Sequence, residues 1–363
     1  MRGDLHPNPH IKALEAEPVD IQISKIDELG IAGCLYPTTS VLRDKGIGKD
    51  EPAPFTRALK EGEPQLSYRC FDLRALEWYY NDPRFDFDVD DIHGRILKKP
   101  NQAGEVVLDR LEFFEFGFAY NEQLDRVFAA FLRYLNDLPT DQQIAMKQHE
   151  LAGEYNLHPD FYRTQILGQW PERISIYDAF LEERYHINQI CELIGKPNLF
   201  LTVLPESKRP RGFGILFRPT NREFRAFSLL LDQLLSEDLN SDFFKGDLEM
   251  HRLLTDGEGN TVRQRKGTIQ LLEEWIDKNF VPVEEEPLNE MYADFRAVRK
   301  ARQKPAHRFE NDDYDQKYVT AQRELIKRGF RAVRTLRMVL ENQPFATSYS
   351  VPHYLREAKV WVM

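Results

Sequence analysis

The sequence contains little cysteine and no long hydrophobic run, and each shortage excludes a class of protein. Cys34, Cys70 and Cys191 are odd in number and far apart, which fits neither a disulfide framework nor a zinc site. No stretch of about eighteen apolar residues is present, so we expect no transmembrane helix. The first ten residues lack the apolar core of a secretory signal. We therefore expect a cytoplasmic protein that does not associate with a membrane.

Positive charge is also scarce overall, but it is concentrated in one segment. The 363 residues include 49 Lys and Arg against 59 Asp and Glu, which gives a formal net charge of -10. Between Met291 and Leu340, thirteen Lys and Arg face only six Asp and Glu, a local excess of seven positive charges. A basic segment in an acidic protein indicates a polyanionic ligand more clearly than the overall charge does.

The length and the hydrophobic pattern predict an α+β protein with more than one domain. We expect an N-terminal domain with a mixed antiparallel sheet and helices over residues 1–200, followed by a linker over 201–219. Residues 220–345 should form an up-and-down helical bundle, and 346–363 a C-terminal arm.

Strand signals dominate the middle of the N-terminal half. Strands are expected at residues 66–73, at 85–90 and at 106–120, where Gly117 would mark a bulge. The sequence Phe-Asp-Phe-Asp-Val-Asp at 85–90 alternates strictly, which places apolar residues on one face and carboxylates on the other. Apolar residues at helical spacing predict a helix at 124–135.

Two features of this half allow a functional interpretation beside a structural one. The carboxylates of Asp86, Asp88, Asp90 and Asp91 suggest calcium, but an EF-hand loop starting at Asp86 would need Gly at 91 and Glu at 97. A solvated strand face is therefore favoured. The aromatic segment at 78–80 could stack on bases, but so dense a cluster is more typical of a core.

Helical signals dominate from residue 175 onward. A helix is expected at 175–194, ended by Gly195 and Pro197. Thr220 and Glu223 form a capping box that starts a helix with a stripe through residue 234. Further helices are expected at 268–280, around 288–298 and at 314–340. Four main helices with short connections are typical of an up-and-down bundle.

One arginine extends the apolar face of the helix around 288–298. The apolar residues follow steps of three, four and three, and the next step of four reaches Arg302. A guanidinium on that face needs an anionic or hydrogen-bonding partner, because burying it alone is costly. Pro305 then interrupts the helix, and His307 follows the interruption.

The segment Arg302-Gln303-Lys304-Pro305-Ala306-His307 resembles the R-x(4–6)-H motif of nucleases in the HEPN superfamily. Gln303 occupies the position after the arginine where many members have Asn, Asp or His. The resemblance covers residues 220–342 and includes the placement of the motif between the last two long helices. The resemblance implies a metal-independent endoribonuclease without a cofactor, which dimerises through the bundle so that two motifs face one cleft.

The resemblance also assigns roles to residues and a setting to the protein. His307 would transfer protons, and Arg302 would bind the scissile phosphate with its forked donors. The surrounding residues would hold flanking phosphates or support the pair: Arg299, Lys300, Gln303, Lys304 and Arg308, with Asn311 and Tyr314 as secondary hydrogen-bond partners. The expected role is that of a toxin or antiphage-defence effector, whose N-terminal half senses a trigger or binds a regulatory partner.

Three other interpretations remain open at this point. The bundle could be a HEPN-like module that binds RNA or nucleotide, or dimerises, without cleaving. The basic segment could be a solvated helix end in which Arg302 pairs with a carboxylate such as Glu310 or Asp313. An enzyme acting on a small ligand through the N-terminal half has support only from the Asp-rich strand and the aromatic segment, where we find no nucleophile and base.

Overall fold

The computed structural model describes residues 20–21, 24, 37–99, 114–123, 125–169, 173–203, 209–255, 261–303 and 312–361. The chain divides into two compact units. The first comprises Met1–Ala75, Asp82–Asp86 and Arg95–Tyr155, and the second Leu76–Asn81, Phe87–Gly94 and Asn156–Met363. An antiparallel sheet occupies the N-terminal half and long helices the C-terminal half, which confirms the α+β class.

The N-terminal half of the chain contains the antiparallel sheet, whose main path runs β1-β5-β4-β3-β2. Its strands are β1 (Tyr68–Phe71), β2 (Phe85–Val89), β3 (His93–Lys98), β4 (Phe114–Tyr120) and β5 (Arg126–Phe131). Its helices are α2 (Thr39–Asp44), α3 (Pro54–Lys60), α5 (Leu132–Asn136) and α6 (Thr140–Lys147), with the 3-10 helix η2 (Leu73–Leu76) after β1. In its core the buried ring of Phe128 contacts the buried rings of Phe71 and Phe116.

The prediction of a helix at 124–135 is wrong for most of that range. Residues 126–131 form β5, and only Leu132–Asn136 is helical. Because β5 lies between β1 and β4, its residues from Val127 to Phe131 are all buried. A central strand buried on both faces has a continuous apolar sequence, which cannot be distinguished from a helix by period alone. Gly117 pairs with Ala129 in regular register, so the expected bulge does not form there.

The alternation at 85–90 is observed in β2, whose Asp86 and Asp88 are exposed as expected. The solvated face does not extend to the next two carboxylates. Asp90 accepts hydrogen bonds from two backbone N–H groups, and Asp91 is 1% exposed and accepts one from the Ser175 hydroxyl at 2.6 Å. The Tyr80 ring contacts Phe87 and Phe217, which supports a packing role for this end of the aromatic segment.

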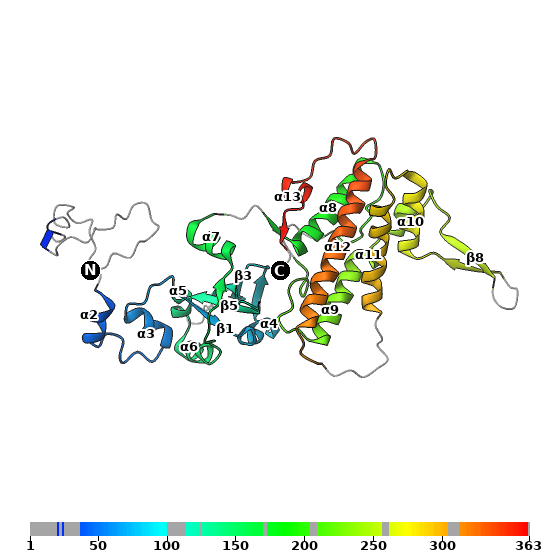
Figure 1. Ribbon diagram of the computed structural model, residues 1–363. Helices are drawn as coiled ribbons and strands as arrows, with labels where there is room; N and C mark the ends of the chain where they lie inside the picture. Colours follow the sequence, from blue (N-terminus) through cyan, green and yellow to red (C-terminus); the bar gives the residue numbers. More distant parts are fainter. Residues whose placement is uncertain are drawn as a thin grey trace. The chain divides into compact units, whose positions relative to one another are not determined.

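The second unit is dominated by helices (Figure 1). They are α4 (Glu77–Asn81), α7 (Pro159–Leu167), α8 (Ile176–Leu193), α9 (Asn221–Asp232), α10 (Thr268–Asn279), α11 (Glu286–Arg302), α12 (Lys317–Glu341) and α13 (His353–Arg356). Shorter elements are the π-helical turn η4 (Gln233–Glu237), the 3-10 helix η5 (Ser241–Phe244), and β6 (Asn156–Leu157), β7 (Ile174–Ser175), β8 (His251–Thr255), β9 (Thr261–Arg265) and β10 (Val360–Trp361). Strands β8 and β9 pair in a hairpin, and β7 pairs with β10.

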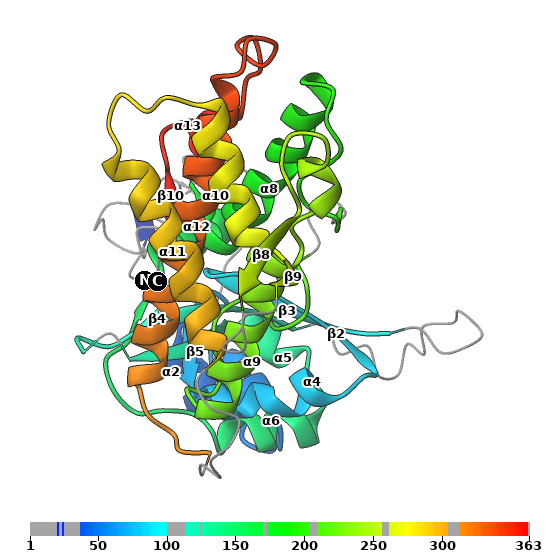
Figure 2. The ribbon, with the colours of Figure 1, turned by 90° about the vertical axis from the view of Figure 1, so that its right-hand side faces the viewer.

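Helix α12 is the centre of this bundle and packs against α8, α9 and α11 (Figure 2). Gly329 lies where α12 meets two neighbours. A Cβ there would lie 3.1 Å from a Leu231 methyl carbon and 3.5 Å from the Phe180 ring, so glycine permits the close approach. Buried residues such as Phe295 and Leu336 fill the space between the helices.

The observed units differ from the predicted domain boundary near residue 200. Helix α8 belongs to the second unit because its apolar face packs along α12. Part of the expected linker is also packed, since Phe213 is 1% exposed. Gln322 of α12 donates to the Gly214 carbonyl at 2.7 Å and accepts from the Leu216 N–H at 3.3 Å.

Within the described residues, no helix combines the length and the apolar composition needed to cross a membrane.

Candidate functional site

Helix α11 places Arg302 in its last turn. The apolar face predicted from the sequence is observed, because Met291, Phe295 and Val298 are fully buried against the bundle. Arg302 follows Val298 by four residues and retains 36% exposure of its side chain. Gln303 caps the helix, with its N–H donating to the Arg299 carbonyl at 3.3 Å.

The partners of Arg302 come from α9 and the π-helical turn that follows it. Its Nη1 atom donates to Asp232 Oδ2 at 3.0 Å and also to a carboxylate oxygen of Glu237. Arg299 Nε lies 3.7 Å from the other oxygen of Asp232. The need for an anionic partner was therefore inferred correctly. Of the two partners suggested, Glu310 lies outside the described residues, and no ion pair within the described part of the chain joins Asp313 to Arg302.

The π-helical turn η4 aligns the two carboxylates. Five residues separate Asp232 from Glu237, which in an α-helix would be about 1.4 turns, so the side chains would diverge. In a π-helix the repeat is i to i+5, as in the hydrogen bond from the Asp238 N–H to the Gln233 carbonyl at 3.0 Å. Both carboxylates can thus contact one guanidinium. Single π-helical turns are rare in proteins, and those that occur are frequently found at functional sites.

Asp232 is a buried charge with a complete set of partners. Its residue exposure is 0%, as is that of Ser236, whose hydroxyl donates to the carboxylate. Burial of an ionised carboxylate is costly unless it is paired and hydrogen-bonded, so Asp232 requires the cations of Arg299 and Arg302. Asp232 therefore fixes the position of the arginines, whereas Glu237, with 39% exposure, contacts Arg302 from the solvent side.

This arrangement can bind an anion. A guanidinium carries five N–H donors, and Arg302 uses only Nη1 for its two carboxylate partners. A phosphate could approach the exposed side of Arg302, and the exposed Lys300, two residues earlier in the helix, adds positive charge to this end of α11. Such a phosphate would either displace Glu237 from Arg302 or bind the guanidinium beside it.

The carboxylates were missed in the sequence, although one signal was present. Ser228, Asp232 and Ser236 follow one another at intervals of four between leucines. Small polar residues at helical spacing within an apolar stretch indicate a polar track on the buried face. In the structure all three are buried.

The remaining residues of the predicted site are only partly described. Lys300 and Gln303 are exposed, and Tyr314 is 66% exposed, with its backbone bridging to Thr220. The structure thus brings Arg299 and Arg302 together on Asp232 and leaves Tyr314 on another segment. Four predicted site residues lie outside the described residues: Lys304, His307, Arg308 and Asn311.

Among the described residues, no group of three His, Cys, Asp or Glu side chains is arranged to hold a metal ion. No family model, curated protein or solved structure matches this chain.

Proposed function

We propose that this protein is a metal-independent endoribonuclease of the HEPN type, in which Arg302 and His307 are the catalytic residues. The observation that carries the proposal is the placement of Arg302. It ends a long bundle helix, contacts a fully buried carboxylate, remains 36% exposed, and precedes a histidine by five residues. An arginine with these properties can bind a phosphate without losing the contact that orients it.

In the proposed reaction the nucleophile belongs to the RNA. The 2′-oxygen attacks the adjacent phosphorus, the bond from phosphorus to the 5′-oxygen breaks, and a proton moves from the 2′-hydroxyl to that leaving oxygen. His307 takes or returns the proton near neutral pH. Arg302 donates hydrogen bonds to the phosphate oxygens, where negative charge develops. The products are a 2′,3′-cyclic phosphate and a 5′-hydroxyl.

The basic residues around the pair would bind the neighbouring phosphates. Arg299 and Lys300 precede Arg302 in α11, and Lys304 and Arg308 follow it in the sequence. Each phosphate contact adds a salt-dependent contribution to binding. Gln303, Asn311 and Tyr314 are proposed as secondary hydrogen-bond partners.

Two copies of the bundle would associate so that their motifs face one cleft, as the family resemblance implies. The resemblance also suggests a toxin or antiphage-defence role in the cytoplasm. The N-terminal unit would then sense a trigger or bind a regulatory partner.

The test is cleavage of a labelled RNA oligonucleotide in EDTA by the full chain and by His307→Ala and Arg302→Ala. We expect the full chain to cleave and both variants to lose most of the activity. His353→Ala and Arg74→Ala are matched controls, because both side chains are exposed, at 67% and 71%, and lie outside the site. Equal cleavage by the full chain and the two site variants would show that the assignment is wrong.

A second candidate function is RNA or nucleotide binding without cleavage. The observation that favours it is that Arg302 already has two carboxylate partners. Such a module would bind RNA with strong salt dependence and leave it intact, and the same residues would weaken binding when substituted.

A further inference from the structure

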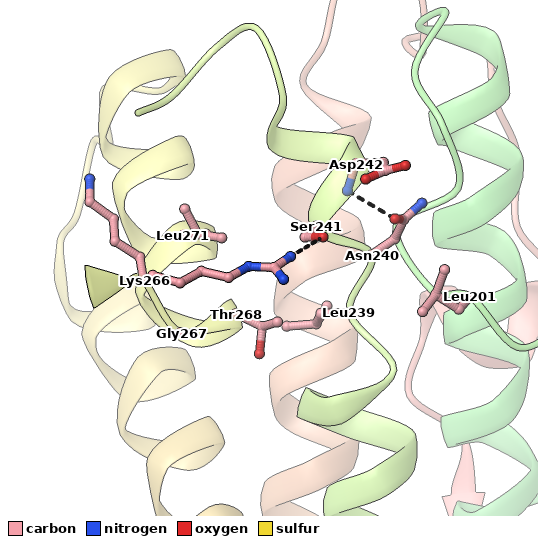
Figure 3. A pocket seen from close by; sticks show the side chains of 10 residues that line it. Leu201, Leu239, Asn240, Ser241, Asp242, Lys266, Gly267, Thr268 and Leu271 are labelled. Atoms are coloured by element: carbon pink, nitrogen blue, oxygen red, sulfur yellow. Dashed lines mark hydrogen bonds between the residues drawn. The ribbon is translucent and has the colours of Figure 1, made fainter. Parts of the chain in front are cut away.

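A cavity of about 510 Å³ lies at the root of the β8–β9 hairpin (Figure 3). Its apolar lining comes from Leu201, Leu239 and Leu271, and its polar lining includes Ser241 and Thr268. This volume is within the range of small-molecule sites, roughly 300–1,000 Å³, and apolar walls with a few polar groups are typical of them.

The cavity lies close to the π-helical turn that supplies a partner of Arg302. Leu239 lines the cavity and follows Glu237, the partner of Arg302, by two residues. Two residues span at most about 7 Å of chain. The Thr268 hydroxyl, beside Leu239 in Figure 3, donates to the carbonyl of Ser236 at 2.8 Å and so fixes this part of the cavity to the π-helical turn. A ligand in the cavity would therefore lie near the π-helical turn whose Glu237 contacts Arg302.

The cavity carries one cation that lacks a carboxylate partner among the described residues. Arg265 donates to the Ser241 hydroxyl at 2.9 Å and forms no ion pair within the described part of the chain. The other charged groups of the lining are compensated. Lys266 pairs with Glu274 at 2.5 Å, and Asp242 pairs with Lys245 at 2.5 Å. The net charge offered to a ligand is therefore positive.

The two strands of the hairpin continue this positive charge away from the cavity, while the sequence between them, residues 256–260, contains Asp256 and Glu258. Figure 1 shows its strands extending beyond α10, away from the other helices of the bundle. The described strands contain three arginines and one histidine and no carboxylate. Arg252 donates to Gln264, which leaves its charge uncompensated, and Arg263 contacts Glu249 at 3.3 Å with both side chains largely exposed. Such an exposed pair is weak and is screened by salt.

The hairpin is also too exposed to be explained by packing alone. A two-stranded ribbon is marginally stable by itself, yet Leu253 is 73% and Val262 50% exposed. Exposed apolar side chains beside arginines are suited to a single-stranded nucleic acid, whose bases and phosphates offer both kinds of contact. A protein partner with an apolar surface would match Leu253 and Val262 but would leave the three arginines of the strands without an anionic group.

We propose that the cavity is a nucleotide subsite for single-stranded RNA and that the hairpin binds the strand that leads away from it. Arg265 contacts a phosphate, the three leucines contact the base or sugar, and Arg252 and Arg263 contact the next phosphates. This inference rests on the proposed function, since it adds a binding track to the same catalytic centre.

The test measures binding of a fluorescein-labelled twelve-nucleotide RNA to the full chain in a His307→Ala background, which prevents cleavage. The double variant Arg252→Ala/Arg263→Ala should weaken binding about tenfold at low salt and lower the slope of log K against log salt by about 1.4, since each single-strand phosphate contact contributes about 0.7. The control Arg74→Ala/Arg84→Ala removes two exposed arginines of the first unit and should leave binding unchanged.

A cavity variant separates the subsite from the general charge of the hairpin. Leu201→Trp narrows the cavity at a side chain that is 61% exposed, so folding should be preserved. We expect about fivefold weaker binding with an unchanged salt slope, because no charge is lost. Arg265→Ala should weaken binding and lower the slope.

The outcomes distinguish this inference from the proposed function. Normal binding by all hairpin and cavity variants, or no RNA binding by the parent protein, overturns the inference, and the cleavage assay of the preceding subsection is then judged separately. Weakened binding by these variants in a protein that never cleaves RNA supports the inference and contradicts the nuclease assignment.

Discussion

Two arginines of the same bundle contact buried carboxylates but differ in their own exposure to solvent. Arg337 of α12 pairs with Glu183 of α8, and their side chains are 3% and 0% exposed. Arg302 pairs with Asp232, which is also fully buried, but its own side chain is 36% exposed and its second partner, Glu237, is 39% exposed. The first pair is closed to solvent and the second is open on one side. Only the open pair can exchange a carboxylate for a phosphate without unfolding the bundle.

An ion pair that is open to solvent on one side is not sufficient for a functional site, as a third ion pair in the bundle shows. Asp294 of α11 is 1% exposed and pairs with Arg331, whose side chain is 48% exposed. The geometry resembles that of Asp232 and Arg302. Arg331 also has a second carboxylate nearby, Glu290 at 3.6 Å. Arg302 differs in that its second carboxylate comes from a π-helical turn and that a histidine follows in the sequence. Arg331 is therefore the natural control for Arg302.

The largest expected effect is on cleavage when the open pair at the site is broken. Arg302→Ala should lower the rate of RNA cleavage about 10³-fold, the magnitude typical of losing a donor to developing charge. Arg331→Ala removes a partly exposed arginine, at 48% against 36% for Arg302, from an aspartate that is also buried, and should leave the rate per folded molecule unchanged. Single-turnover kinetics with both variants provide the measurement. A similar loss in both variants would mean that the effect is structural.

Breaking the closed pair should affect stability instead. Arg337→Met leaves Glu183 buried without its cation and should lower the free energy of unfolding by about 3–5 kcal/mol. Adding Glu183→Leu removes the stranded charge and should restore most of that loss. Urea denaturation of the two variants tests this, and an additive loss in the double variant would contradict it.

Removing the exposed carboxylate of Glu237 should increase the affinity of Arg302 for RNA. Glu237→Gln deletes a competitor for the Arg302 guanidinium while Asp232 continues to orient it, so RNA affinity should rise. An exposed ion pair is worth about 0.2–1 kcal/mol, which corresponds to an increase of up to about fivefold. The titration is best done in the His307→Ala background. Weaker binding would mean that Glu237 positions Arg302 rather than competing for it.

The smallest effect concerns pH at the closed end of the bundle. Burial and the nearby Arg337 charge lower the pKa of His186 to about 4, and its ring lies 2.6 Å from the Tyr349 hydroxyl. The unfolded chain, with an ordinary histidine pKa near 6.5, binds the proton first as the pH falls, so stability is lost between about pH 6.5 and 4. Because the ring is partly exposed, we expect about 1 kcal/mol.

Thermal unfolding of the full chain and of His186→Gln across this pH range provides the measurement. The glutamine can hydrogen-bond but does not titrate, so the variant should lose this part of the pH dependence. An identical pH profile in both proteins would assign the dependence to other groups.

The local parts of the fold followed from the sequence, and the long-range parts did not. The phase of Arg302 was predicted correctly because the helical repeat alone determines it. Its partners lie 65 and 70 positions earlier in the chain, and the π-helical turn that aligns them has no spacing signal. Strand β5 was taken for a helix because burial on both faces removed its alternation. Helix α8 was assigned to the wrong half because its packing partner, α12, is far along the chain.

The most direct test of the account is the chemistry of the cleaved ends. A labelled RNA and the same oligonucleotide with one 2′-deoxy position are incubated with the full chain in EDTA, and the products are analysed by mass spectrometry. The account predicts 2′,3′-cyclic phosphate and 5′-hydroxyl ends, with no cleavage at the deoxy position and none with Arg302→Ala. Ends carrying a 5′-phosphate, or cleavage at the deoxy position, would contradict it.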